Sequence, residues 1–244
     1  MPKARKIAIK AALVFLALVL VASLAHFLIF PQETKSLLVG FSELPGKGRV
    51  HYSKATPQEK VDSLVQLIRQ ASARVSTFWP GQYSDPRFIF CNERRDFEKY
   101  SVNPEAPAVT YLKLGSVIVL SADALDLDII AHEMSHAEFY ERIGFYAFNQ
   151  KVPAWFKHGL AMQCDLRDYY SEDTLRARTD GFRNLPDIRS CTTDAQFYSG
   201  AHDQVKLHYM AARYEVGHWY SKAKLEKLVK ELNEGKSFGE AMGK

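Results

Sequence analysis

The first thirty residues differ from the rest of the chain in their hydrophobic pattern. Residues 11–30 carry no formal charge, and His26 is the one ionisable side chain among them. As a helix, such a run spans about 30 Å, the thickness of the hydrocarbon core of a bilayer. Four basic residues precede it: Lys3, Arg5, Lys6 and Lys10. Because a basic flank stays cytoplasmic, residues 1–30 predict a membrane anchor, with everything after Phe30 periplasmic or extracellular.

A cleavable signal peptide is the alternative interpretation of this segment. Ser23-Leu24-Ala25 could serve as a cleavage site, and the remaining protein would then be secreted. An uncleaved anchor is favoured because residues 26–30 continue the apolar stretch beyond that point. Both interpretations place the rest of the chain outside the cytoplasm.

The pattern after the anchor predicts a linker followed by one folded domain. Residues 31–48 contain Pro45 and glycines and are predicted to lift the domain, residues 49–244, off the membrane. Thr56 then opens a helix, with proline at the first helical position and a capping-box glutamate. Apolar residues on one face continue this helix to about Thr77: Val61, Leu64, Leu67 and Ile68.

Short apolar and β-branched runs in the domain predict strands, and runs at helical spacing predict helices. The predicted strands are residues 49–53, 87–91, 109–112 and 116–120, the last two forming a hairpin around Lys113-Leu114-Gly115. The predicted helices are residues 95–100, 128–142, 154–164, 203–220 and 222–232, with a final turn at Ser237. Residues 165–202 are polar and predict a long loop region. Strands followed by helices favour an α+β fold.

The net charge of +4 comes from the membrane flank. The first ten residues hold four of the 32 basic side chains and no acidic one, so 28 basic and 28 acidic residues balance in the remainder. A balanced domain gives no indication of nucleic-acid binding. Its length suits a single domain with a substantial core.

The chain has three cysteines, Cys91, Cys164 and Cys191. In an oxidising compartment Cys164 and Cys191 could form a disulfide, which would leave Cys91 buried in an apolar run. The other interpretation is three unpaired cysteines that behave as small hydrophobic residues.

Residues 132–136 read H-E-M-S-H and carry the most specific chemistry of the chain. In a helix, His132 and His136 lie one turn apart on the same face, where both can bind one metal ion. Glu133 lies beside them and could take a proton from a metal-bound water. A solvated helix face is the competing interpretation of this pattern.

A catalytic zinc site needs a third protein ligand and an open position for water. Residues 152–161 read V-P-A-W-F-K-H-G-L-A, which resembles the second metal-binding helix of the gluzincin, or thermolysin-like, metallopeptidases. That helix often reads P-x-W-[FL]-x-E-G-L-A, and its glutamate is the third ligand. The order of elements after about Arg87 and the ending at 235–242 are also similar, so the resemblance covers about two thirds of the chain. It implies a zincin-like metallopeptidase domain.

His158 stands at the position of that glutamate. Imidazole is a good zinc ligand, and sites with three histidines are chemically ordinary. Exchanging a carboxylate for neutral imidazole raises the formal charge of the site by one, which favours ionisation of a bound water at least as strongly. The alternative is a decayed site that binds metal poorly or not at all.

The resemblance implies roles for five residues. Zn²⁺ would be bound by His132, His136 and His158, and Glu133 would act as general base in peptide-bond hydrolysis. Gluzincin-like enzymes often stabilise the developing oxyanion with a tyrosine or histidine from a later helix. Tyr209 best resembles that residue. A purely structural role for Tyr209 stays open, and the same predicted helix also holds His208 and Tyr214.

Several neighbouring features have structural or functional interpretations. The predicted strand 116–120 is either an edge strand that pairs with an extended substrate or an internal strand. Glu138 and Glu141 are expected as solvated carboxylates, although either could support a metal ligand. His202 and His218 are expected to be ordinary surface or core histidines.

The sequence therefore predicts a membrane-anchored zinc metallopeptidase that acts on peptide or protein substrates outside the cytoplasm. A second hypothesis is an inactive gluzincin-like domain that serves as an envelope interaction or scaffold module. A third is zinc-dependent hydrolysis of a non-peptide amide, because H-E-x-x-H does not itself select the substrate. The substrate and the oligomeric state stay open.

Overall fold

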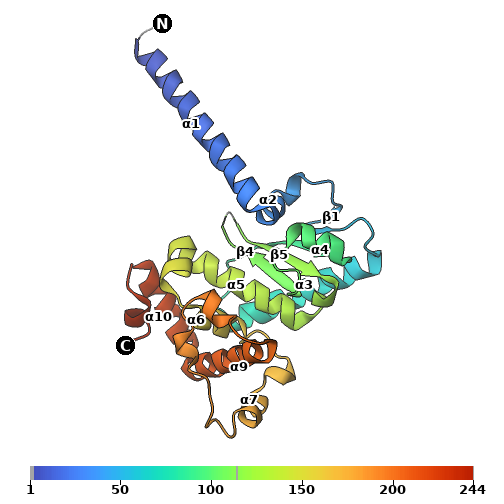
Figure 1. Cartoon of the computed structure of the whole chain (residues 1–244), viewed down its shortest axis with the longest axis vertical. Coiled ribbons are helices and arrows are strands. Elements are labelled where there is room, and N and C mark those ends of the chain that lie inside the picture. Colours follow the sequence, from blue (N-terminus) through green and yellow to red (C-terminus); the bar gives the residue numbers. More distant parts are fainter. Residues whose placement is uncertain (1–2, 114, 244) are drawn as a thin grey trace.

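The computed structural model describes residues 3–113 and 115–243 and has a mixed α+β architecture. Helix α1, Lys3–Ile29, projects from the remainder as a single rod (Figure 1). Its segment Ile7–Ile29 is long and apolar enough to cross a membrane. The predicted apolar helix is therefore present. Leu114, at the centre of the predicted hairpin turn, lies outside the described residues.

Residues 31–48, predicted as a linker, are folded against the domain. They form helix α2 (Pro31–Leu37), a 3₁₀ turn (Val39–Phe41) and strand β1 (Gly46–Lys47). Lys113 Nζ lies 2.8 Å from Glu33 Oε2, and Ser36 Oγ donates a hydrogen bond of 3.1 Å to the Tyr100 carbonyl. Val39 is fully buried. The linker prediction was wrong, because this segment buries the side chain of Val39 and its Glu33 carboxylate forms an ion pair with Lys113.

The described residues form a five-stranded sheet in the order β1-β2-β3-β5-β4. Its other strands are β2 (Val50–Tyr52), β3 (Arg87–Cys91), β4 (Ala108–Tyr111) and β5 (Val117–Ser121). β5 runs parallel to β3 and antiparallel to β4, with Val109 opposite Val119. The predicted strand 116–120 is thus internal, and the first arm of the hairpin, β4, forms the edge. β5 cannot be an edge because β3 occupies its other side.

The two faces of the sheet carry separate cores, as the alternation along β3 requires. Phe88 and Phe90 face α3 (Gln58–Phe78) and α5 (Leu127–Tyr146), which cover one face (Figure 1). Ile89 and Cys91 face the other way, where they pack with Val39 and with α4 (Arg94–Tyr100). A 3₁₀ turn (Ala122–Ala124) connects β5 to α5.

The C-terminal half supplies the remaining helices. They are a π-helical turn (Ala147–Lys151), α6 (Ala154–Ala161), α7 (Glu172–Arg178), α8 (Asp194–Phe197), α9 (His202–Trp219), α10 (Lys222–Asn233) and α11 (Phe238–Ala241). The region 165–202, predicted as a loop, contains α7, α8 and two 3₁₀ turns, Asp168–Tyr170 and Ile188–Ser190. Its isolated apolar residues Leu175, Ile188 and Phe197 are buried and hold these short elements in place.

Two local features define the ends and contacts of the central helices. Gly144 has a φ of 74° and interrupts α5 near its end, two residues after the predicted end of the helix at residue 142. Gly159 lets α6 approach α9 closely, because a Cβ there would lie 2.5 Å from Val216 Cγ2. All three cysteines are buried and free, so the proposed Cys164–Cys191 disulfide is not formed.

Candidate metal centre

Helix α5 presents His132 and His136 on one face. The helix begins where the Asp126 side chain accepts hydrogen bonds from the backbone N–H groups of Asp128 and Ile129, at 2.7 and 3.1 Å. The rings of His132 and His136 lie one turn later with centroids 4.9 Å apart. His132 is 8% exposed. The interpretation of these residues as a solvated helix face is wrong.

Helix α6 brings the third histidine to the same place. Pro153 precedes its first turn, and Trp155 and Phe156 of that turn are buried in the core. His158 is 7% exposed, and its ring centroid lies 5.1 Å from that of His136. One ligand atom from each of the three histidines lies within 4.8 Å of the other two. The structure therefore gathers all three predicted ligands.

The chemistry of this cluster fits a metal ion that prefers nitrogen ligands. Burial lowers the pKa of His132 to about 3 and lowers the pKa values of His136 and His158. All three imidazoles are therefore neutral near pH 7 and keep a lone pair for a metal. The Nδ1 atom of His158 is buried without a hydrogen-bond partner. A buried polar nitrogen without a partner is costly, so this atom also indicates a ligand.

An ion pair lies behind His132. Asp165 is fully buried, and its Oδ2 is 4.0 Å from His132 Nδ1. The Arg167 guanidinium donates hydrogen bonds to both oxygens of this carboxylate, at 2.9 and 2.5 Å. Burial alone would raise the pKa of Asp165, but the hydrogen bonds and charge of Arg167 outweigh burial and lower it. The anion therefore persists next to His132, where it favours a ring orientation with Nε2 turned to the site.

Glu133 is held by the edge of the sheet. Thr110 of β4 donates a hydrogen bond from Oγ1 to Glu133 Oε2 at 2.5 Å. Burial raises the pKa of Glu133 to about 7, although the hydrogen bond from Thr110 lowers it in part. A carboxyl group with that pKa can both accept and release a proton near neutral pH, which a general acid–base residue requires.

Two tyrosines lie over the histidines. The ring of Tyr209, in α9, is 6.0 Å from that of His132 and 5.6 Å from that of His158. Tyr198 was not identified from the sequence, since it follows α8 in the polar region and belongs to no motif. Its ring is 5.3 Å from that of His158, and its hydroxyl is 3.1 Å from the Tyr209 hydroxyl. The site therefore has a pair of phenolic groups where one was predicted.

The other two residues considered in α9 turn away from the histidines. His208 Nδ1 lies 2.7 Å from the Phe197 carbonyl, and Tyr214 stacks on Phe182 with centroids 5.0 Å apart. His202 and His218 are exposed, as expected.

Glu138 is fully buried, so its prediction as a solvated carboxylate was wrong. It accepts hydrogen bonds from the backbone N–H groups of Tyr83 and Ser84, both at 2.8 Å, and from Arg142 Nε at 2.7 Å. This carboxylate fastens the segment after α3 to α5 and contacts no metal-site histidine. Glu141 is exposed, as expected, and accepts a hydrogen bond from Ser116 Oγ at 2.9 Å.

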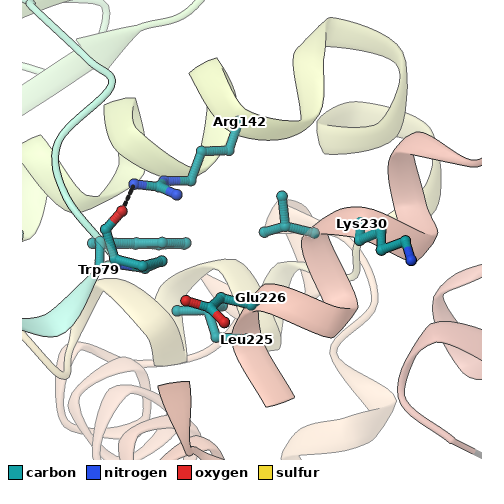
Figure 2. A pocket seen from close by; sticks show the side chains of 7 residues that line it. Trp79, Arg142, Leu225, Glu226 and Lys230 are labelled. Carbon is teal, nitrogen blue, oxygen red and sulfur yellow. Dashed lines mark hydrogen bonds between the residues drawn. The ribbon is translucent and has the colours of Figure 1, made fainter. Parts of the chain in front are cut away.

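Two small pockets lie outside the histidine cluster. Figure 2 shows the first, of about 160 Å³, where the Arg142 guanidinium donates to the Pro80 carbonyl beside Trp79 and faces Leu225 and Glu226 of α10. The second, of about 360 Å³, is lined by residues that include Tyr170, Arg213 and His218. Neither is lined by His132, His136 or His158.

No family model matches this chain, and no curated protein or solved structure matches it. The chemistry of the site therefore rests on its own residues.

Proposed function

We propose that the chain is a membrane-anchored zinc metallopeptidase with a zincin-like domain on the outer side of the membrane. One observation carries this proposal: a ring nitrogen of His158, in α6, lies within 4.8 Å of ring nitrogens of both His132 and His136, in α5. Three imidazole ligands leave one position of a tetrahedral zinc ion open, as catalytic zinc sites require. When bound, zinc would polarise a water molecule and the carbonyl group that is attacked.

The residues around the histidines have the chemistry for hydrolysis. Glu133 accepts the proton of the attacking water and delivers it to the leaving amine. Its hydrogen bond from Thr110 orients the carboxylate for that transfer. Tyr209 donates its hydroxyl proton in a hydrogen bond to the carbonyl oxygen as negative charge develops there, and Tyr198 orients that hydroxyl.

Strand β4 provides a place for an extended peptide. It ends the sheet next to the metal centre, since Thr110 of this strand contacts Glu133 of α5. An edge strand has unpaired backbone N–H and C=O groups, and these can pair with a substrate in β conformation. This geometry favours peptides over small amides as substrates.

The decisive experiment measures zinc content and peptide cleavage on the same protein. The purified full-length protein is expected to contain close to one zinc ion per chain and to cleave a mixed peptide library in a chelator-sensitive manner. His158→Ala is expected to lose most of the zinc, whereas His218→Ala, an exposed histidine of α9, retains it. Less than about 0.2 zinc per chain in the unaltered protein, restored by His158→Glu, contradicts the three-histidine site.

The alternative function is an inactive domain that serves as an envelope interaction or scaffold module. The observation that favours it is His158 itself, which stands where the resembled helix carries glutamate. A protein that binds zinc but cleaves no peptide in the library would support this alternative.

A further inference from the structure

His158 has a carboxylate partner from a distant part of the chain. Oδ1 of Asp194, the first residue of α8, lies 3.3 Å from His158 Nε2. A capping box formed by Thr193 and Gln196 holds this short helix at its first turn. The second oxygen of Asp194 lies 3.7 Å from Lys157 Nζ. The carboxylate is therefore held between two consecutive side chains of α6.

The same short helix fixes the plane of the His158 ring. Phe197, at the other end of α8, is fully buried and stacks on this ring with centroids 4.3 Å apart and planes inclined by 26°. The Asp194 carboxylate and the Phe197 ring together restrict both the tilt and the rotation of the imidazole. Helix α8 thus acts as a support for one ligand of the metal centre.

The two nitrogens of His158 have different surroundings. Nε2 faces Asp194, which does not belong to the group whose ligand atoms lie within 4.8 Å of one another. The carboxylate therefore contacts the cluster through His158 alone. Nδ1 is buried and has no hydrogen-bond partner. Nδ1 is consequently the nitrogen left for a metal ion.

We propose that Asp194 is a positioning residue of the metal centre: it accepts a hydrogen bond from His158 Nε2–H and directs Nδ1 to the metal. This inference rests on the metal site of the proposed function. A carboxylate behind an imidazole fixes its tautomer and makes it a stronger ligand. The negative charge that glutamate would bring at position 158 is thereby supplied one residue further from the metal, by Asp194.

The first test measures zinc affinity with a competing chromophoric chelator. Asp194→Asn in the full-length protein is expected to weaken zinc binding about 10–100-fold, the usual effect of removing such a partner. Asp194→Glu keeps the carboxylate and is expected to recover part of the loss. The matched control is Asp187→Asn, an exposed aspartate that precedes the neighbouring 3₁₀ turn, and its affinity should not change.

A second readout reports the tautomer directly and does not depend on a variant that folds. In nitrogen NMR spectra of the zinc-loaded protein with labelled histidine, His158 is expected to show a protonated Nε2 and a metal-bound Nδ1. Its signals are assigned by through-bond correlation to the backbone resonances of residue 158. A metal-bound Nε2 at His158 overturns the inference.

The failures of the two proposals are distinguishable. Equal zinc affinity of the unaltered protein and Asp194→Asn overturns the role of Asp194 and leaves the metal centre standing. Absence of zinc binding in the unaltered protein overturns both.

Discussion

Glu133 combines two properties that a general base at a metal centre needs. It follows His132 directly in α5, so the helix itself sets its distance from the proposed metal position. Its carboxylate is oriented from outside the helix, by the hydroxyl of Thr110 in β4. The proposed chemistry therefore depends on one contact between the edge of the sheet and α5, in addition to the three histidines.

Glu133→Gln separates the proton transfer from metal binding. Glutamine keeps the size of the side chain but cannot accept the proton of the attacking water, so peptide cleavage is expected to fall by a factor on the order of 10²–10⁴. Zinc content should be unchanged, because Glu133 is not one of the three ligands. Both quantities are measured on the same purified sample.

Glu141→Gln is the control for this substitution, since Glu141 is an exposed carboxylate on the same helix. It should retain both zinc and activity. Unchanged cleavage by Glu133→Gln would refute the proposed base.

The contact between α6 and α9 sets the geometry of the site at the scale of elements. α6 carries His158 and α9 carries Tyr209, and the two rings lie 5.6 Å apart. The close approach of these helices depends on Gly159, because backbone and side-chain atoms of α9 occupy the space that a side chain at this position would need. A Cβ at this position would lie 2.6 Å from the Ala212 carbonyl oxygen, which is closer than van der Waals contact allows.

Gly159→Ala is expected to destabilise the protein although alanine is the better helix former. The helical preference favours alanine by about 1 kcal/mol, whereas an extra carbon in a packed interface typically costs about 1–3 kcal/mol. Because backbone atoms of α9 must move, we expect a net loss of unfolding free energy and weaker zinc binding. Denaturant unfolding followed by circular dichroism measures the first quantity.

Gly239→Ala is the matched control, because this glycine is also helical and a Cβ there meets nothing within 4 Å. It should be neutral or slightly stabilising. A Gly159→Ala protein as stable as this control would show that α6 and α9 are not tightly packed.

At the scale of the molecule, helix α1 and the domain are joined through α2. His26 Nδ1 lies 2.8 Å from Thr34 Oγ1, and Lys113 Nζ lies over the Phe30 ring at 4.2 Å from its centroid. Lys113 also pairs with Glu33. α1 therefore leaves the domain in a defined direction, and α7 and α9 lie at the opposite end of the domain (Figure 1).

Truncation tests whether α2 belongs to the domain. A protein that begins at residue 31 retains α2 and Val39, whereas one that begins at residue 46 loses both. Loss of the buried Val39 alone should lower the unfolding free energy by about 1.5–3 kcal/mol. Denaturant unfolding of the two soluble proteins measures the difference.

Phe41→Ala in the longer protein is the control, since Phe41 is 90% exposed and its removal should leave stability unchanged. Equal stability of the two truncated proteins would mean that residues 31–45 are a linker after all.

Local patterns in the sequence determined most elements and part of the site. The uncharged run after residue 10, the short apolar run of β3 and the four-residue spacing of His132 and His136 are each set by neighbours along the chain. The resemblance of the α6 segment to the second metal-binding helix of gluzincins then predicted His158 as the third ligand. These features could be predicted because helix and strand periodicities are properties of short segments.

Other features were decided only by the tertiary structure. β4 rather than β5 forms the edge, Glu138 is buried, α2 packs on the domain, and Tyr198 and Asp194 contact His158. Each depends on a contact between residues far apart in the chain, such as Asp194 with His158 or Lys113 with Glu33. Such contacts follow from how whole helices and strands pack, and the local periodicity that predicts an element carries no information about its distant partner.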